Sequence, residues 1–161
     1  MQIRKATPHD KKELTRLLKE FSIDFATKIL SEKQTRIRAY KNPNKWVEET
    51  VEHYLSQPEH IVFVADEHEI LKGFIEGEVK EHKDKVYDRE GYISKWFMEE
   101  EYQNSGIGKQ LFTRLVEEFK KMDCTHIGLD THLENTQAIR IYEHMGFTKR
   151  LITFFKPLKN L

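Results

Sequence analysis

Apolar residues recur along this chain with two periods, one typical of helices and the other typical of strands. A short strand is predicted at residues 3–6. A helix should follow it, because Thr7, Pro8 and Asp10 combine a hydroxyl cap, an early proline and an acidic first turn. Residues 46–55 predict a second helix. The buried face of the first helix is marked by apolar residues at helical spacing: Leu14, Leu17, Leu18 and Phe21.

Runs rich in β-branched and aromatic residues predict the remaining strands. The densest run, residues 61–65, predicts a central strand, and a turn at residues 66–69 returns the chain as its hairpin partner. Residues 80–90 carry many charges and no apolar periodicity, so we expect a loop there. The strands expected after the first are residues 61–65, 70–79, 92–98, 126–133 and 147–158.

Two more helices are predicted in the second half of the chain. One has an apolar face made by Leu111, Phe112, Leu115, Val116 and Phe119. The other spans residues 136–145 and ends at Gly146, which suits a left-handed cap. Between residues 22 and 44 the periodicity weakens and basic side chains accumulate. This order predicts an α/β fold, a mixed sheet with helices on both faces. A single domain over residues 1–161 is expected, since no repeat or long linker divides it.

Composition and charge narrow the classes of protein that remain. The chain has 161 residues, enough to bury a sizeable core in one domain. Its 27 basic and 27 acidic side chains balance, which argues against nucleic acid or a membrane surface as partner. The single cysteine, Cys124, excludes a disulfide framework, and the 8 histidines form no ligand-like cluster, so we expect no metal. No apolar run approaches the roughly 20 residues of a membrane span, so a cytoplasmic protein is expected.

The most distinctive segment is residues 103–108, between the strand expected at 92–98 and a helix. Gly106 and Gly108 let the backbone turn tightly, and the helix that begins there adds amides and a positive dipole end. Such a turn can hold an anion, so a phosphate-bearing ligand is the first hypothesis. The alternative is an ordinary connection whose glycines only relieve strain. ATP or GTP binding is disfavoured, because no Gly-Lys-Ser/Thr follows the glycines.

Two motifs in residues 90–150 resemble those of the GNAT superfamily of acetyl-CoA-dependent N-acetyltransferases. The pattern Gln/Arg-x-x-Gly-x-Gly/Ala is matched by Gln103, Gly106 and Gly108. The resemblance covers essentially the whole chain and implies a mostly antiparallel sheet with a splayed parallel strand pair at the coenzyme site. A second motif, Asn-x-x-Ala-x-x-x-Tyr-x-x-x-Gly-Phe, is matched by Asn135, Ala138, Tyr142, Gly146 and Phe147.

The resemblance implies that acetyl-CoA is the cosubstrate and that its pyrophosphate lies on the turn. Ser105 stands where the family usually has a basic residue or glycine, so we expect less charge assistance without loss of binding. The amides implied are those of Asn104, Ser105, Gly106, Ile107, Gly108 and Lys109.

The strand before the turn should bind the pantetheine arm of the coenzyme through its backbone. The resemblance assigns this to the segment Trp96, Phe97 and Met98, whose side chains we expect in the core. The splay would also leave a backbone donor to hold the thioester oxygen as negative charge builds.

Tyr142 is the candidate catalytic acid, because a phenol with a reference pKa near 10 can protonate a departing thiolate with one near 8.5. Asn135 lies seven residues earlier on nearly the same helix face and is implied to bind the coenzyme tail. The alternative for Tyr142 is an amphipathic tyrosine packed over the sheet. A covalent route through Cys124 is disfavoured.

The base that takes the proton of the amine is not identified by the pattern. Exposed strand carboxylates are usually solvated surface, and a chain of waters would serve equally well. The candidates are Glu76, Glu78, Glu90, Asp130 and His132.

The predicted function is transfer of an acetyl group from acetyl-CoA to a primary amine of a small molecule or peptide by direct attack. The alternative is a catalytically silent acyl-CoA-binding sensor or regulatory module. Residues 22–44 are expected to line the acceptor site, since family members vary most there. Many relatives form dimers, so a homodimer is open.

Overall fold

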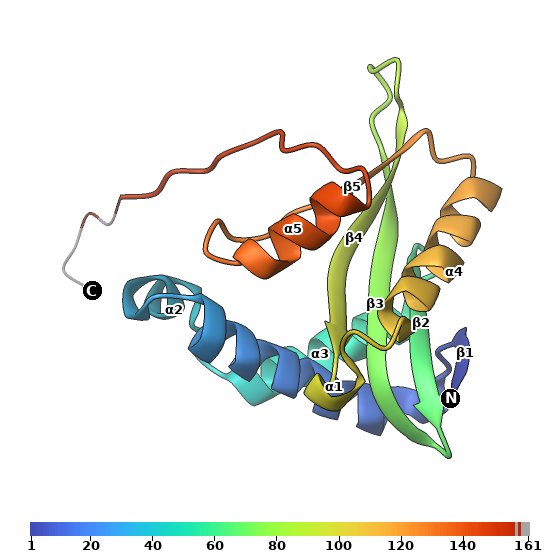
Figure 1. Cartoon of the computed structure of the whole chain (residues 1–161), viewed down its shortest axis with the longest axis horizontal. Helices are drawn as coiled ribbons and strands as arrows, with labels where there is room; N and C mark the ends of the chain where they lie inside the picture. Colours follow the sequence, from blue (N-terminus) through green and yellow to red (C-terminus); the bar gives the residue numbers. More distant parts are fainter. Residues whose placement is uncertain (157, 159–161) are drawn as a thin grey trace. The chain divides into compact units, whose positions relative to one another are not determined.

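One five-stranded sheet, in the order β1-β2-β3-β4-β5, organises the chain in a computed structural model that describes residues 1–156 and 158 (Figure 1). Strands β1 to β4 pair in antiparallel fashion, and β4 and β5 are parallel. The predicted mixed, mostly antiparallel sheet is confirmed. The strands are β1 (Gln2–Lys5), β2 (His60–Glu67), β3 (Ile70–Glu81), β4 (Arg89–Met98) and β5 (His126–Leu129).

The chain divides into two compact units. The first unit comprises Met1–Phe21 and Asn42–Asp130, and the second comprises Ser22–Lys41 and the chain from Thr131. The α-helices are α1 (Lys11–Asp24), α2 (Glu32–Arg38), α3 (Pro43–Ser56), α4 (Ile107–Lys121) and α5 (Thr136–His144). Shorter helical turns are η1 (Pro8–Asp10), η2 (Phe25–Ile29) and η3 (Glu100–Tyr102).

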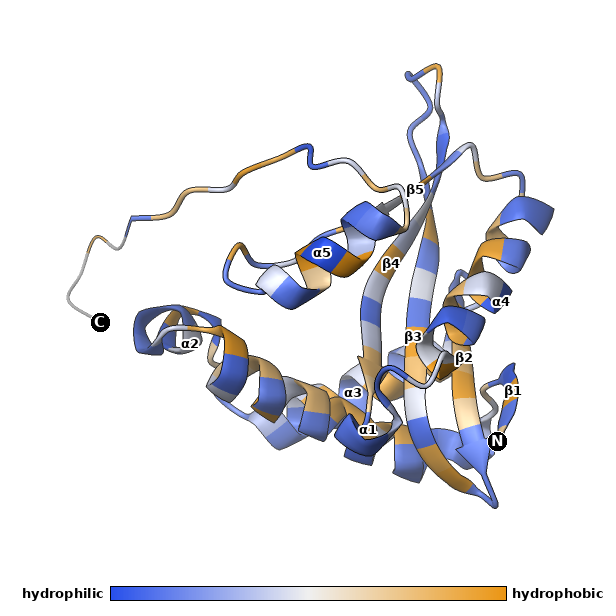
Figure 2. Ribbon diagram, viewed as in Figure 1, coloured by the Kyte–Doolittle hydropathy of each residue, from blue (hydrophilic) through white to orange (hydrophobic). Residues whose placement is uncertain are grey.

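Helices cover both faces of the sheet in the first unit, because alternate residues of its strands point to opposite sides. On one face α1 and α3 pack on Val62, Val64 and Phe74. On the other face α4 packs through Leu111 and Leu115, whose exposed fraction is 0%. Full burial of a leucine side chain stabilises the fold by about 1.5–3 kcal/mol, so packing of this apolar face holds α4 against the strands. Figure 2 shows the apolar and polar positions along the strands.

Charged residues at the ends of β3 and β4 are strand rather than loop, contrary to the prediction for residues 80–90. Lys80 pairs with Glu90, and Glu81 pairs with Arg89. The pairing of backbone groups extends the two strands beyond their apolar parts, so the connection is only residues 82–88.

Two predicted strands differ at the C-terminal side. The strand expected at 126–133 ends at Leu129, where its pairing with β4 stops. The strand expected at 147–158 is wrong for residues 147–156 and 158, while residue 157 lies outside the described residues. No strand of the described chain pairs with this segment, and Leu151 and Phe154 are exposed. Strand-like composition alone does not make a strand without a partner.

Helix α2 lies within the stretch where the apolar periodicity weakens. It begins with a capping box, in which Ser31 accepts from the Gln34 amide and Gln34 accepts from the Ser31 amide. This Ser-x-x-Gln spacing was a sequence signal for the helix that the apolar pattern did not carry.

Candidate functional site

The backbone of the glycine turn adopts left-handed conformations that a tight reversal requires. Asn104 has a φ of 60°, and Gly106, the N-cap of α4, has a φ of 83°. A residue with a Cβ is strained at such a φ, so Gly106 is explained by the chain's own geometry. The turn thereby directs residues 106–109 into the first turn of α4.

The amides at the start of α4 are those that the sequence predicts to hold an anion. Gln110 N donates to Gly106 O at 3.2 Å, and Ile107 N lies 3.4 Å from Ser105 Oγ. Within residues 1–156 and 158, the amides of Gly108 and Lys109 meet no acceptor. These amides and the positive end of a 15-residue helix favour an anion there.

Gly108 has no explanation inside the chain. Its φ is not positive, and a Cβ built on it would lie 3.6 Å from Trp96 Nε1 and 3.7 Å from Met98 Cγ, ordinary contact distances. Neither strain nor packing therefore demands glycine at this position. A close approach by a ligand would be a physical reason for glycine here.

Gln103 and Ser105 shape the turn. Gln103 Nε2 donates to Met98 O at 3.2 Å, which ties the turn to the end of β4. Ser105 Oγ donates to Tyr102 O at 2.5 Å, so its hydrogen points to the loop carbonyl in this structure. Tyr102 donates in turn to Glu67 at 2.8 Å, and this bond raises the pKa of Tyr102. A contact between Ser105 and phosphate stays a prediction.

Strand β4 runs on beyond the end of its pairing with β5. The parallel register stops at Ile93 and Leu129, whereas β4 continues to Met98 along β3. Glu76 is opposite Lys95 and Gly77 is opposite Ile93, so Ser94 is the extra residue of a bulge at this point. The parallel pair is therefore short where the resemblance places a pantetheine arm.

The side chains of the predicted strand segment pack in the core, as expected. The Trp96 ring stacks on Phe112 with centroids 5.5 Å apart, and the Phe97 ring lies 6.0 Å from that of Phe21. Met98 is 8% exposed. Backbone binding of a coenzyme by these residues stays a prediction.

A polar cluster lies on the α3 side of the sheet, next to the bulge. Glu76 of β3 is 0% exposed, which corrects the expectation of a solvated strand carboxylate. Its Oε1 lies 2.6 Å from His60 Nδ1, and its Oε2 accepts from Ser94 Oγ. Tyr54 of α3 covers the cluster, with its hydroxyl 3.5 Å from Ser94 Oγ.

Burial and the negative charge of Glu76 set the pKa values of this cluster. The hydrogen bond to Glu76 raises the pKa of His60, and burial raises the pKa of Tyr54. Gly73 and Gly77 of β3 leave room for Met98 and Phe119 on the α4 face of the sheet, so they carry no signal for the burial of Glu76 on the other face. Glycines at such positions indicate a strand on which other residues pack closely.

The other candidate bases have different surroundings. Glu78 pairs with Lys80 at 3.3 Å, and Glu90 lies 2.9 Å from His82 Nε2. Asp130 accepts from the Tyr92 hydroxyl. All three carboxylates are more exposed to solvent than Glu76.

Asn135 and Tyr142 belong to α5 in the second unit. Asn135 caps this helix, accepting from Ala138 N at 3.3 Å and donating to Thr131 Oγ1 at 3.1 Å. The Tyr142 ring packs edge to face on Phe147, with centroids 6.0 Å apart, and Gly146 has a φ of 89° after the helix. The second motif therefore builds a capped and terminated helix, and the coenzyme and acid roles of Asn135 and Tyr142 stay predictions.

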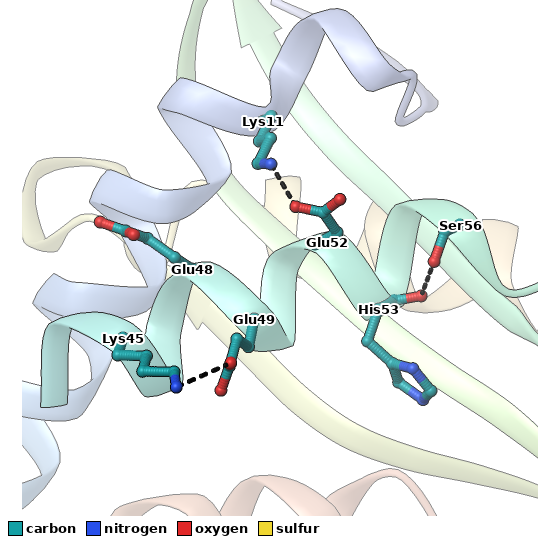
Figure 3. Close-up of a pocket in the computed structure, with 7 residues that line it drawn as sticks. All are labelled: Lys11, Lys45, Glu48, Glu49, Glu52, His53 and Ser56. Atoms are coloured by element: carbon teal, nitrogen blue, oxygen red, sulfur yellow. Dashed lines mark hydrogen bonds and ion pairs between the residues drawn. The ribbon is translucent and has the colours of Figure 1, made fainter. Parts of the chain in front are cut away.

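A shallow depression on the outer side of α1 and α3 has charged walls (Figure 3). Lys11 pairs with Glu52, and Lys45 lies 3.6 Å from Glu49. These charges neutralise one another within the depression, which lies across the sheet from α4 and the turn. No step of the predicted chemistry is assigned to it.

A family model described as the acetyltransferase (GNAT) family matches residues 23–147. The chain belongs to the GNAT family. Both sequence motifs and the turn described above lie within or at the edge of the matched region. Burial raises the pKa of the Cys124 thiol, which disfavours the thiolate that a covalent route would need.

The relatives of this GNAT protein include N-alpha-acetyltransferases. It is 32% identical over 108 residues to N-alpha-acetyltransferase 30 of Dictyostelium discoideum, covering 66% of this chain and 57% of the relative. It is 29% identical to the human protein of that name, again over 66% of this chain but only 29% of the relative. The match thus spans well under two thirds of these relatives' lengths.

Solved structures support the GNAT fold. The tetramutant of the BH1408 protein from Bacillus halodurans superposes with a TM-score of 0.82 at 22% identity, covering 98% of this chain and 100% of that one. An aminoglycoside N-acetyltransferase in complex with CoA has a TM-score of 0.77 at 16% identity, covering 98% and 95%. Within the described residues, no helix has the length and hydropathy of a membrane span, and no cluster of three or more His, Cys, Asp or Glu side chains suits a metal ion.

Proposed function

We propose that this GNAT protein transfers an acetyl group from acetyl-CoA to a primary amine by direct attack of the amine on the thioester. The observation that carries the proposal is Gly108, whose absent side chain nothing inside the protein requires. It stands beside the amides that begin α4, within the family's glycine motif. A diphosphate lying on those amides accounts for both features.

The donor is acetyl-CoA in this proposal. Its pyrophosphate lies on the amides of residues 104–109, and its pantetheine arm runs along β4 past Ile93. The early end of the β4–β5 pairing supports this path, because an arm with two amide groups can bond to a strand edge. The aminoglycoside N-acetyltransferase that shares this fold was solved in complex with CoA, which adds support for the donor.

Tyr142 donates the proton that the departing thiolate needs, and Asn135 orders the start of the same helix. Both assignments rest on the family motif and on the suitable pKa order of phenol and thiol. Attack on the thioester carbonyl builds negative charge on its oxygen, which a backbone donor of β4 left free just beyond Ile93 would hold.

The acceptor is an amine of a protein or of a small molecule. The relatives include an N-alpha-acetyltransferase, an aminoglycoside acetyltransferase and a spermine/spermidine acetyltransferase. These differ in acceptor, so the shared chemistry is the amine. A cytoplasmic location and a homodimer complete the proposal.

A thiol-release assay tests this function directly. Purified protein and acetyl-CoA are incubated with spermidine, kanamycin and a peptide with an unmodified N-terminus, each beside a reaction without acceptor. We expect thiol release above that control with at least one amine, and the acetylated amine by mass spectrometry. Calorimetry with CoA is run in parallel. Binding without turnover would instead support the silent acyl-CoA-binding alternative, and no binding of CoA would contradict both.

A further inference from the structure

Glu76 is a buried carboxylate that the proposed function does not yet use. A buried charge is costly unless hydrogen bonds or an opposite charge compensate it. Here Ser94 and His60 supply one contact to each carboxylate oxygen. Because both oxygens of Glu76 are hydrogen-bonded, Glu76 and His60 can exchange a proton while the groups around them stay in place.

The contacts of Glu76 lead in two directions. Toward β5 they reach Ser94, which is half-buried and directly follows Ile93, the last β4 residue paired to β5. Toward the surface they reach His60, whose side chain is 8% exposed. The ring of His60 lies 4.7 Å, centroid to centroid, from that of His53, an exposed residue of α3. Hydrogen-bonding groups therefore run from Ser94, at the end of the strand pairing, to His60, whose ring packs against that of exposed His53.

We propose that Ser94, Glu76 and His60 form a proton relay that removes the proton from the attacking amine and passes it toward solvent beside His53. The relay rests on the proposed function, which places the thioester along β4 just beyond Ile93. Ser94 is the residue of the three that meets the amine. Glu76 and His60 act through it and are positioning and proton-holding residues.

The transfer balances in protons and electrons. The N–H bond of the ammonium breaks, its electron pair stays on nitrogen, and the proton goes to Ser94 Oγ. The O–H proton of Ser94 passes at the same time to Glu76 Oε2, and a proton is then held between Glu76 Oε1 and His60 Nδ1. The nitrogen lone pair forms the C–N bond, and the C–S bond breaks with its electron pair on sulfur. The nitrogen gives up its second proton at this stage, and that proton balances the one that the departing thiolate takes up. His60 later loses a proton to water, which resets the relay.

The geometry favours Glu76 over the other carboxylates that the sequence offers as candidate bases. Glu78, Glu90 and Asp130 each have a partner, but none belongs to the fully buried class and none adjoins the bulge of β4. The bulge matters because an extra residue redirects the side chain at that point. Ser94 therefore faces the α3 side of the sheet and reaches Glu76.

The relay predicts the direction of the pH dependence of turnover. The hydrogen bond to Glu76 raises the pKa of His60 above 6.5, and the relay accepts a proton only when His60 is neutral. Turnover should then rise with pH through a value above 6.5. The charged and titratable groups around the pair are His53 and Tyr54 from α3, Glu59 before β2, Glu78 from β3 and Lys95 from β4.

The test compares Glu76→Gln, Ser94→Ala and His60→Gln with the parent protein. The control Glu59→Gln removes a similar charge near His60 without touching Glu76. For each protein, the pH dependence of kcat is measured with the best amine of the panel above, and CoA affinity is measured by calorimetry. The titration of His60 is followed by NMR of the histidine-labelled protein.

We expect kcat to fall about 100-fold or more in Glu76→Gln and at least tenfold in Ser94→Ala. CoA affinity should stay within about twofold in all variants, and Glu59→Gln should match the parent. His60→Gln should move the acidic limb of kcat to lower pH, because a carboxylate alone then holds the proton. The NMR pKa of His60 should fall in Glu76→Gln.

Two results would overturn the relay. One is a folded Ser94→Ala or Glu76→Gln protein whose kcat lies within about twofold of the parent across the pH range. The other is a His60→Gln variant whose acidic limb coincides with that of the parent. If Glu76→Gln fails to fold, the measurements on Ser94→Ala and His60→Gln still test the relay. A parent protein that binds no CoA or acetylates no amine of the panel overturns the proposed function and the relay together.

Discussion

Replacing Gly108 by tryptophan separates ligand binding from folding. The residue lies in the first turn of α4, where Gly108 N points toward the proposed pyrophosphate. A Cβ fits there at 3.6–3.7 Å from Trp96 and Met98, so the first atom of a new side chain is tolerated. An indole extends further and occupies the space beside the helix amides that the coenzyme would take.

The expected loss of affinity follows from the contacts removed. Each hydrogen bond between an amide and a charged phosphate oxygen contributes about 1.5–3 kcal/mol. Displacing the pyrophosphate from the amides of Gly108 and Lys109 removes two of them, about 3–6 kcal/mol. This corresponds to a loss of at least about 100-fold in Kd, since 1.4 kcal/mol is tenfold.

The matched control is Gly108→Ala. It adds only the Cβ that the structure accommodates, and the family motif admits glycine or alanine at this position. Alanine is favoured over glycine in a helix by up to about 1 kcal/mol, so Tm should rise by about 2–4 °C for a chain of this size. Its affinity for CoA should fall, but by less than that of Gly108→Trp, because a single Cβ narrows the approach of the phosphate without filling the space.

Calorimetry with CoA and acetyl-CoA measures both affinities, and thermal unfolding checks that each variant is folded. The reasoning fails if folded Gly108→Trp binds CoA as tightly as the parent. It also fails if Gly108→Ala lowers Tm, because the room for a Cβ was then misjudged.

Three further predictions concern the acid, the buried histidine and the acceptor segment. Tyr142→Phe should lower kcat about 100-fold while CoA affinity changes less than about twofold; equal turnover at every pH would remove its role as acid. The raised pKa of His60 should stabilise the fold fully below pH 6.5, a contribution lost as pH rises through the folded-state value, so the Tm difference between parent and His60→Gln should shrink from pH 6 to pH 8.5. Exchange of residues 22–44 for those of a relative should change the order of preferred amines in the panel, and an unaltered order would count against an acceptor role.

The local sequence pattern was sufficient to predict the structure where the conformation of one residue or the apolar face of one helix decides it. The apolar face around Leu111 and Leu115 predicts α4, and both are fully buried against the sheet. The glycine turn was predictable for the same reason. Gly106 adopts a left-handed φ, which a residue with a Cβ would adopt only under strain. Side-chain period and backbone freedom are properties of short segments.

Pairing decided the cases in which the pattern was misleading. Residues 147–156 have the composition of a strand, yet no strand of the described chain pairs with them. Lys80 and Glu90 have the composition of a loop, yet they extend β3 and β4 because each completes the other's hydrogen bonds. A strand is a property of two segments, and a single segment does not specify its partner.

The amino-acid sequence by itself determined the family motifs, the turn and the alternation of strands and helices, since each depends on residues a few positions apart. Only the tertiary structure decided that Glu76 is buried. Its surroundings come from Tyr54 on α3, His60 on β2 and Ser94 at a bulge of β4. Whether a carboxylate on a strand meets water or protein depends on what packs over it, and that is settled when distant segments come together.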